Sequence, residues 1–428
     1  KGFGLGGWLV LEGYMWNYPG FGSTSVLEAE IENLIGSDKK KLFFETYREN
    51  YINEKEIKFL ADNGFNALRI PLHYKHFSAS KNSFSEEGFQ ILDPVISLCK
   101  KYGIYIILDM HAAPGAQNTN DFSDSDGQNA YLFTEESNQE WLASIWKYIA
   151  DYYANEPIIA AYDLLNEPVL PWGKGPSVLR KTYETSIDSI REVDQNHIVI
   201  IEGNWYGNDH SGLLPPFDSE MVYSFHHYIG GIDDTNYIHQ YTTNLQKQFN
   251  VPLWVGEVGE NSNTWAHNKK SFFESKNIGW SWWNFKSLER ISSLFSYRKT
   301  EDFQRIIDFW QGSGPKPDTL DAFTTLMSFA ELTSFDSCDI NIGLVRALVD
   351  SSFSYVSKPF SSFKPPGQLP AINYDTGNNG VAYHDNQSVD PNKFSPETKS
   401  WNNGWTYRND GVDIGVSNAG IEESYYVG

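Results

Sequence analysis

The sequence predicts an α/β protein, a (β/α)₈ TIM barrel with a small C-terminal β-rich appendage. Eight short runs of β-forming residues alternate with longer helical patterns over about residues 1–300. Most of these runs are largely apolar, as expected of parallel strands covered on both faces. The length of 428 residues suits one barrel of roughly 250 to 400 residues plus a small unit.

The eight predicted strands fall at intervals along the first 300 residues. They are Phe3–Leu5, Ala67–Ile70, Tyr105–Leu108, Ile159–Leu165, Ile198–Ile201, Met221–Phe225, Leu253–Val255 and Gly279–Trp283. Helical periodicity between them is clearest in Asn53–Asn63, Phe89–Lys101 and Asn138–Ala154. Eight alternating units favour closure of the sheet into a barrel.

The remaining third of the chain is predicted to hold a helical extension and a tail. Helical patterns continue in Phe303–Trp310 and Leu320–Leu332, separated by a stretch rich in Gly and Pro. We therefore place the catalytic barrel domain at residues 1–357. Residues 358–370, rich in Ser and Pro, are predicted to be a linker. Residues 371–428 carry short runs of Asn, Gly, Asp and Tyr and are predicted to form a partial β-sandwich fragment.

Charge and composition narrow the class of partner. With 33 basic and 55 acidic residues the net charge is −22, which repels nucleic acid and anionic lipid but not a neutral polymer. No apolar run approaches the ~18 residues of a membrane span. The chain starts at Lys1 without an apolar leader, and we expect a secreted or cell-surface monomer whose signal peptide has been removed. The two cysteines, Cys99 and Cys338, could form one disulfide or remain free thiols.

Chemically capable residues stand at the C-terminal ends of six predicted strands, where barrel enzymes carry their active sites. Ile159–Leu165 runs into Asn166 and Glu167, and Leu253–Val255 runs into Glu257. The other ends carry Arg69, Asp109, His111, His226, His227, Tyr228 and Trp283. Taken singly, several have an ordinary structural explanation: Arg69 as an ion-pair partner, His111 as a core histidine and Trp283 as packing. Their convergence predicts catalysis.

The two glutamates are predicted to act as a pair. Their strands are the fourth and seventh of the barrel and stand on roughly opposite sides of its mouth. Cleavage of a glycosidic bond by double displacement needs two carboxyl groups about 5 to 5.5 Å apart. Glu167 suits the proton donor because the amide of Asn166 beside it can hold a sugar hydroxyl.

Over about residues 1–300 the chain resembles glycoside hydrolase family 5. The matching segments are Gly64–Pro71, Leu108–His111, Leu164–Pro168, His226–Tyr228, Trp254–Glu257 and Trp280–Lys286. The resemblance implies that Glu167 is the acid/base and Glu257 the nucleophile. It also implies that the subsite of the reacting sugar is shaped by Arg69, His111, Asn166, His226, Tyr228 and Trp283.

Two further segments resemble the fungal exo-β-1,3-glucanase branch of that family, Leu5–Glu12 and His111–Asn118. This resemblance implies that Glu12 contacts the terminal glucose. The stretch from Glu202 to His210 departs from the branch, which leaves the substrate open. Four tryptophans in predicted loops are candidate stacking platforms, of which we expect about two to reach sugar: Trp16, Trp172, Trp205 and Trp265.

The tail resembles the first half of a family 6 carbohydrate-binding module. The matching segments are Asn373–Asp375, Gly380–Asp385 and Tyr407–Ile414. Pro370 and Ile372 stand where that family has the glutamates of its structural calcium site, and the second half of the sandwich is not present in the sequence. We therefore expect neither calcium nor independent sugar binding, and hypothesise that the fragment packs on the barrel, because half a sandwich leaves open strand edges.

The function favoured by the sequence is a retaining β-glycosidase that hydrolyses β-glucan, with β-1,3 linkages preferred and a polysaccharide or oligosaccharide as partner. One alternative is a family relative acting on β-1,4-glucan, β-1,6-glucan or β-mannan. Another is a carbohydrate-binding barrel without catalysis. No metal or cofactor is expected, because no His/Asp cluster has ligand spacing and no glycine-rich phosphate loop is present. Endo and exo cleavage both remain open.

Overall fold

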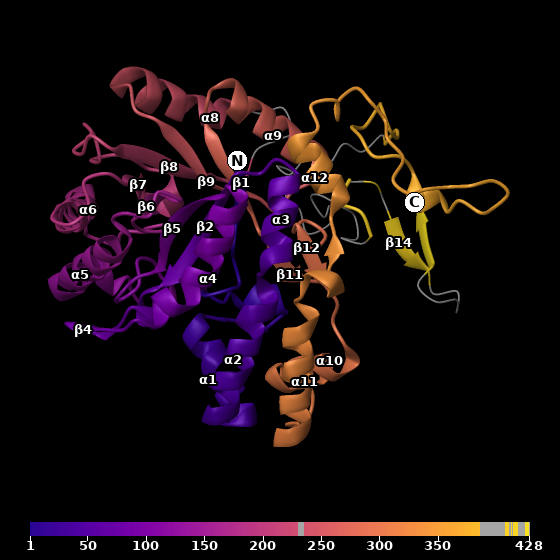
Figure 1. Cartoon of the computed structure of the whole chain (residues 1–428), viewed down its shortest axis with the longest axis horizontal. Helices are drawn as coiled ribbons and strands as arrows, with labels where there is room; N and C mark the ends of the chain where they lie inside the picture. Colours follow the sequence, from indigo (N-terminus) through magenta and orange to yellow (C-terminus); the bar gives the residue numbers. More distant parts are fainter. Residues whose placement is uncertain (230–234, 386–406, 411, 413, 418–423, 428) are drawn as a thin grey trace.

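The computed structural model describes residues 1–229, 235–385, 407–410, 412, 414–417 and 424–427. Eight parallel strands close into a barrel (Figure 1) in the order β1-β10-β9-β8-β7-β6-β5-β2. They are β1 (Gly2–Gly4), β2 (Ala67–His73), β5 (Tyr105–Ala112), β6 (Ile159–Asp163), β7 (Ile198–Glu202), β8 (Met221–His227), β9 (Leu253–Gly259) and β10 (Gly279–Trp283). The predicted fold class is confirmed, and each predicted strand overlaps one barrel strand. The fourth predicted strand, Ile159–Leu165, extends two residues beyond β6, which ends at Asp163.

Helices follow the barrel strands along the chain. They are α3 (Glu54–Asp62), α4 (Glu87–Tyr102), α5 (Glu136–Tyr153), α6 (Pro176–Arg191), α8 (Asn236–Tyr241) with the π-helical turn η5 (Thr242–Lys247), and α9 (Asn263–Ser275). The three predicted helices are confirmed as α3, α4 and α5. The start of α3 shows why the sequence folds there: Asn53 caps the helix and Glu56 returns a bond to the Asn53 backbone, which forms a complete capping box.

Alternation along the strands places a polar layer above an apolar one inside the barrel. Ile107, Ala161 and Ile200 form a separate buried hydrophobic cluster. Two residues further along the same strands stand Asp109, Asp163 and Glu202, all fully buried. Because side chains two apart on a strand point to the same side, these carboxylates lie above the apolar cluster, towards the C-terminal mouth.

Two insertions flank the junction of β1 and β10. After β1 come two helices that the sequence analysis did not identify, α1 (Thr24–Ile35) and α2 (Ser37–Tyr51). After β10 come β11 (Lys286–Leu288), β12 (Phe295–Tyr297), α10 (Glu301–Trp310), α11 (Thr319–Leu332), β13 (Asp339–Ile340) and α12 (Ile342–Val349). Figure 1 shows α2 beside α11, and Phe329 of α11 packs edge-on against Trp16 at 5.3 Å. The predicted helices of the extension are confirmed as α10 and α11.

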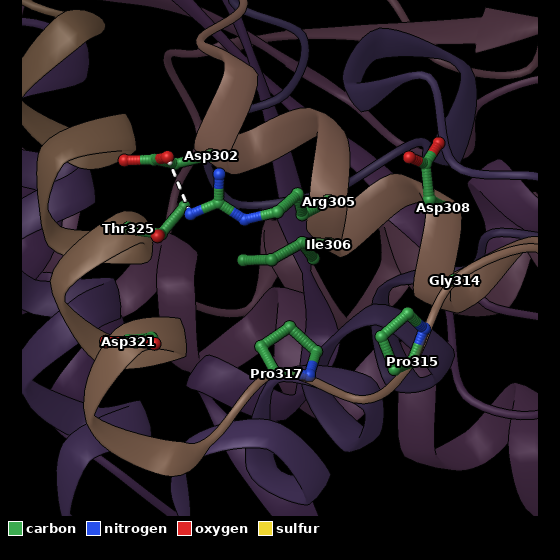
Figure 2. Close-up of a pocket in the computed structure, with 9 residues that line it drawn as sticks. All are labelled: Asp302, Arg305, Ile306, Asp308, Gly314, Pro315, Pro317, Asp321 and Thr325. Carbon is green, nitrogen blue, oxygen red and sulfur yellow. Dashed lines mark ion pairs between the residues drawn. The ribbon is translucent and has the colours of Figure 1, made fainter.

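A surface pocket of about 210 Å³ lies between α10 and α11 (Figure 2). It is lined by Asp302, Arg305, Ile306, Asp308, Gly314, Pro315, Pro317, Asp321 and Thr325. Its polar side chains include the ion pair of Asp302 with Arg305 at 2.7 Å, which is largely exposed. None of the residues predicted to form the active site lines this pocket.

The two cysteines do not form a disulfide. Cys99 is buried in α4 and Cys338 is partly buried, and both are free thiols. Burial raises the pKa of Cys99 to about 12, so this thiol stays protonated and unreactive. The open choice between a disulfide and free thiols is thereby decided in favour of free thiols.

The described part of the tail contacts the barrel near the end of β9. The Asn409 side chain donates to the carbonyl of Asn261 at 2.7 Å. Asn263 donates from its backbone to Asn409 at 2.9 Å and from its side chain to Asp410 at 2.7 Å. Within the tail, β14 (Ile414–Ser417) and β15 (Ser424–Val427) pair antiparallel. Residues 386–406, 411, 413, 418–423 and 428 lie outside the described part, so the domain boundaries and the sandwich assignment stay predictions.

Among the helices in the residues that the structure describes, none has the length and apolar character needed to cross a membrane.

Candidate active site

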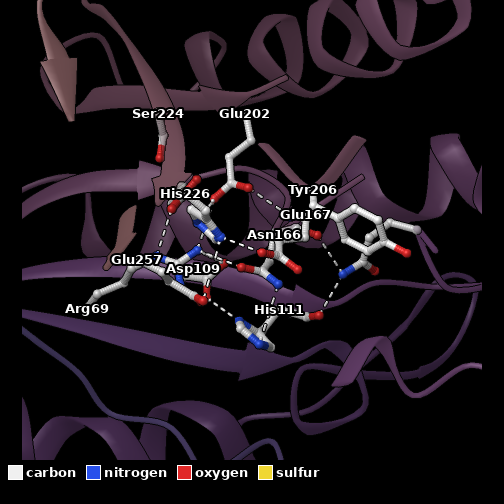
Figure 3. A network of polar contacts seen from close by, with 12 residues as sticks. Arg69, Asp109, His111, Asn166, Glu167, Glu202, Tyr206, Ser224, His226 and Glu257 are labelled. Atoms are coloured by element: carbon white, nitrogen blue, oxygen red, sulfur yellow. Dashed lines mark hydrogen bonds and ion pairs between the residues drawn. The ribbon is translucent and has the colours of Figure 1, made fainter. Parts of the chain in front are cut away.

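Arg69 lies at the centre of a buried polar network at the mouth of the barrel (Figure 3). Its side chain is fully buried. The guanidinium donates to Asp163 at 2.9 Å and to Glu257 at 2.7 Å. It also meets carboxylates and an amide on three other strands or loops: Glu202 at 3.1 Å, Asp109 at 3.2 Å and Asn166 at 2.9 Å. Arginine suits this place because its planar group carries five donors and stays charged when buried.

The network holds more carboxylates than its cations can balance. Burial raises the pKa of Asp163 well above its usual value, and the charges of Glu202 and Asp109 add to this although Arg69 lowers it. Asp163 is therefore the carboxyl of the cluster whose protonated form burial favours most clearly. A raised pKa of this kind is expected where several carboxylates face one another.

His226 connects the two predicted catalytic glutamates. Its Nδ1 lies 2.6 Å from Glu167 and 3.6 Å from Glu257, while Nε2 lies 2.9 Å from Glu202. Burial alone would lower the pKa of His226, but the charges of Glu202 and Glu257 raise it well above its usual value. A carboxylate therefore lies within ion-pair distance of each ring nitrogen, which favours the protonated ring, although Nε2 makes no hydrogen bond among the described residues.

Glu167 and Glu257 face each other across this histidine. One carboxylate oxygen of each, together with a nitrogen of His226, lies within 4.8 Å of the others. Three such groups could also hold a metal ion. The closeness of the nearest oxygens is compatible with the spacing of about 5 to 5.5 Å between the carboxyl groups of retaining glycosidases.

The pKa values of the two carboxyl groups are shifted in opposite directions. Burial raises the pKa of Glu167, helped by the charge of Glu257, and the contact with His226 only partly offsets it. Burial also acts to raise the pKa of Glu257, but the charges of His226 and Arg69 outweigh it and lower that pKa below its usual value. A pair of carboxyls with diverging pKa values can supply one acid and one anion at the same pH.

The backbone of Glu167 is held in an unusual conformation. Its φ is +46°, a left-handed value that a residue with a side chain adopts only where the surroundings impose it. The Glu167 N–H donates to Glu202 at 2.8 Å, and its carbonyl accepts from Asn118 at 2.9 Å. Gln117 in the same loop donates to the carbonyl of Asn166 at 2.9 Å. These bonds fix the direction in which the Glu167 carboxyl points.

The other residues predicted around the reacting sugar surround the same centre. Tyr228 donates to Glu257 at 2.6 Å. His111 lies 2.7 Å from Asp109 and stacks on Trp283 with ring centroids 5.6 Å apart. The structure therefore brings together, around Glu167 and Glu257, the residues Arg69, His111, Asn166, His226, Tyr228 and Trp283.

Glu12 stands at the edge of this centre, after β1. Its side chain is buried at 6% exposure. Among the residues that the structure describes, its Oε1 atom has no hydrogen-bond partner. Burial raises the pKa of Glu12 well above its usual value, and the charges of Glu257, Asp121 and Glu260 raise it further. Glu12 thus lies within electrostatic reach of Glu257, and its contact with the terminal glucose stays a prediction.

The tryptophans predicted in loops divide into two pairs. Trp16 and Trp265 are buried, and Trp265 lies inside α9 rather than in the predicted loop; the expectation that about two of the four tryptophans reach sugar stays a prediction. Trp172 is fully exposed and Trp205 is 63% exposed. Their two loops are joined by a hydrogen bond of 2.9 Å from Leu170 to Asn204. Trp205 follows β7 at a φ of +59° and is outside the buried network; whether it contacts sugar stays a prediction.

The sequence analysis missed two carboxylates of the network, Asp163 and Glu202. Both stand at the end of an otherwise apolar strand, which is a signal that could have identified them. Glu202 contacts more of the network than most of the predicted residues, since it meets Arg69, His226 and the backbone of Glu167. It had been noted only as the start of a segment that departs from the fungal branch.

Comparison with known proteins gives several relatives. A beta-xylosidase of Phanerodontia chrysosporium is 32% identical over 232 residues, covering 53% of this chain and 48% of that protein. Endoglucanase C of Acetivibrio thermocellus is 32% identical over 192 residues, covering 44% and 53%. A probable glucan 1,3-beta-glucosidase A of Aspergillus fumigatus is 28% identical over 235 residues, covering 53% and 55%. The chain spans about half the length of the curated relatives it matches.

Solved structures and a family description complete the comparison. A rutinosidase from Aspergillus niger superposes with a TM-score of 0.56 at 20% identity, over 68% of this chain and 90% of that one, which supports the barrel fold. Residues 28–289 match the family described as "Cellulase (glycosyl hydrolase family 5)". This match covers more than half of the chain. The chain belongs to glycosyl hydrolase family 5.

Proposed function

We propose that the protein is a retaining β-glycosidase, with Glu257 as nucleophile and Glu167 as acid/base. The observation that carries the proposal is the pair of carboxylate oxygens within 4.8 Å of each other, one with a raised and one with a lowered pKa. Retaining enzymes hold their two carboxyl groups about 5 to 5.5 Å apart, closer than the roughly 6.5 to 9.5 Å of inverting enzymes, which leave room for a water between them.

The reaction proceeds in two displacements. In the first, Glu257 attacks the anomeric carbon while Glu167 gives its proton to the departing glycosidic oxygen. In the second, Glu167, now ionised, takes a proton from water, which attacks the anomeric carbon and releases Glu257. The β configuration is retained because the anomeric carbon is inverted twice.

The surrounding residues support each step. Arg69 and Tyr228 each hold one oxygen of Glu257, at 2.7 and 2.6 Å, and so keep it ionised and aimed. His226 lies between the two carboxyl groups, where its charge stabilises whichever of them is ionised. Together these contacts preorganise the site before the sugar binds.

We propose β-glucan as the substrate, with β-1,3 linkages favoured. The support is the Glu12 motif and the likeness to a protein named glucan 1,3-beta-glucosidase A. The endoglucanase and beta-xylosidase relatives favour the alternative that another glucan or a xylose-containing glycan is cleaved. A binding barrel without catalysis is disfavoured, because such a protein has no use for two carboxyls with opposed pKa shifts.

Proton NMR of a fresh digest tests the mechanism, and product analysis tests the substrate. We expect the β-anomer to appear first, followed by slow mutarotation, whereas initial release of the α-anomer contradicts the double displacement. Laminarin, lichenan, pustulan and glucomannan are compared as substrates, with the Glu257→Ala variant as the inactive control. Laminarin turned over at least tenfold more slowly than lichenan or glucomannan would contradict the β-1,3 preference alone.

A further inference from the structure

Two carboxylates beside the nucleophile keep a buried oxygen without a hydrogen bond. Glu12 follows β1, and Glu260 follows β9 three residues after Glu257. Within the described part of the chain, Oε1 of each has no hydrogen-bond partner and almost no contact with solvent. A buried carboxylate oxygen is costly unless it accepts a hydrogen bond, so both atoms are suited to a ligand that brings donors.

Arg290 and Tyr14 both act on the Glu260 carboxylate and lower the pKa that burial raises, but no described residue forms a hydrogen bond to the Oε1 atom. The Arg290 guanidinium approaches Glu260 to 3.6 Å, which balances charge but is too long for a hydrogen bond. It packs instead on the ring of Tyr14, 4.5 Å from the centroid. The Tyr14 hydroxyl accepts from the Trp283 indole at 3.0 Å. Tyr14 thus connects the Glu260–Arg290 pair to Trp283, which is predicted to shape the subsite of the reacting sugar.

Electrostatics couples Glu12 and Glu260 to Glu257. Burial raises the pKa of both, and the charge of Glu257 adds to this, although Arg290 and a hydrogen bond with Tyr14 act to lower the pKa of Glu260. Glu260 also raises the pKa of Glu12. The position of Glu260 beside the predicted sugar-stacking ring is given by its backbone hydrogen bond to the Trp283 carbonyl.

The loop that carries Glu260 is fixed from both sides. Glu260 has a φ of +51°, and its N–H donates to the carbonyl of Trp283 at 3.2 Å. Behind it, the carbonyl of Asn261 accepts from Asn409 of the tail at 2.7 Å. A carboxylate held in this way loses little conformational entropy when a ligand binds.

We infer that Glu260, together with Glu12, accepts hydrogen bonds from hydroxyl groups of the sugar on the nucleophile's side of the scissile bond, and so selects a neutral glycone. The inference rests on the proposed function and assigns Glu260 a part in it. Sugar hydroxyls supply the donors that both oxygens lack. Uronic acids and sulfated sugars are disfavoured, because a carboxylate or sulfate brings acceptors and would leave both oxygens without a donor.

Deoxy substrates test this assignment. Wild type and Glu260→Ala are compared on p-nitrophenyl β-D-glucoside and its 3-, 4- and 6-deoxy analogues. We expect wild type to lose about 10- to 150-fold in kcat/KM on the analogue that lacks the bonded hydroxyl. Glu260→Ala should lose a similar factor on the parent glucoside and little more on that analogue. The control is Glu274→Ala, which removes an exposed carboxylate from α9 and should behave as wild type.

Two outcomes overturn the inference. One is that every analogue loses the same factor in wild type and in Glu260→Ala, which would indicate a purely structural role. The other is that Glu260→Ala behaves like Glu274→Ala. Absence of wild-type activity on all glucans and glucosides counts against the proposed function instead. Calorimetry of laminaritriose binding to Glu257→Ala, with and without Glu260→Ala, then decides: at least about tenfold weaker binding is expected, and an unchanged Kd contradicts the inference.

Discussion

Two buried ionic sites in the described part of the chain differ in design. The Arg69 network at the barrel mouth sets Arg69 and His226 against five carboxyl groups: Asp109, Asp163, Glu167, Glu202 and Glu257. The second site, between α3 and β11, joins Lys286 to Glu56 alone at 2.6 Å, with both side chains fully buried.

The second site is balanced in charge and in hydrogen bonds. Lys286 also donates to the carbonyl of Thr333 at 2.6 Å. The other oxygen of Glu56 accepts from the Asn53 backbone at 3.0 Å in the helix cap. At the mouth, by contrast, Glu12 and Glu260 each retain an oxygen without a hydrogen bond in the described residues. In the Lys286–Glu56 site, which supports the fold, each buried charge has one partner of opposite charge. At the barrel mouth, where a ligand and a proton bind, carboxyl groups outnumber cations.

Removing the central cation of the mouth should have the largest effect on activity. Arg69→Met withdraws two contacts that hold Glu257 and Asn166. By analogy with the loss of one preorganised donor, we expect kcat to fall by at least about 10²- to 10³-fold. Steady-state kinetics measures this, with circular dichroism as the check on folding. A folded variant with near-normal kcat would show that the network is structural.

Removing Lys286, the cation of the second site, should lower stability and leave activity unchanged. Lys286→Met leaves Glu56 buried without its partner, and we expect it to lower the free energy of unfolding by about 3–5 kcal/mol. The kcat of the folded fraction should be unchanged. Chemical denaturation and active-site titration measure the two quantities. The double variant Glu56→Leu, Lys286→Met should recover much of the stability, and a large fall in its kcat would remove the distinction between the two sites.

Replacing Tyr228 should have a smaller effect, a shift in the pH profile of kcat/KM. Tyr228→Phe removes the hydrogen bond that helps to lower the pKa of Glu257. Because Glu257 must be ionised to attack, the acid limb of kcat/KM should move to higher pH when this hydrogen bond is lost. The basic limb, set by the raised pKa of Glu167, should stay in place. Movement of the basic limb alone would assign the two roles the other way round.

The sequence was sufficient for the barrel and most of its mouth. Apolar runs and helical periods gave all eight strands, because parallel strands buried on both faces are distinctive. The polar residues that end those strands could be read directly, and Arg69, Glu167 and Glu257 do meet in one network. Because the barrel brings the strand ends together, the position of these residues at strand ends was enough to predict that they meet in one site.

What the sequence could not give depends on which way a side chain faces in the folded chain. Trp16 and Trp265 looked like loop residues but are packed in the core, since tertiary burial is not visible in local pattern. Glu202 ends an apolar strand, but the local sequence does not show that its side chain points towards Arg69. Glu260 acquires its setting only because the insertion after β10 brings Arg290 to it.

The assignment of Glu257 as nucleophile is the central claim, and covalent trapping tests it most directly. The enzyme is incubated with 2-deoxy-2-fluoro-β-D-glucosyl fluoride, whose fluorine slows release of a glycosyl-enzyme intermediate. Intact mass followed by peptide mapping should show one 2-deoxy-2-fluoroglucosyl group, attached to Glu257. An adduct on Glu167 or on another residue, or none in an enzyme that turns over β-glucosides, would contradict the account.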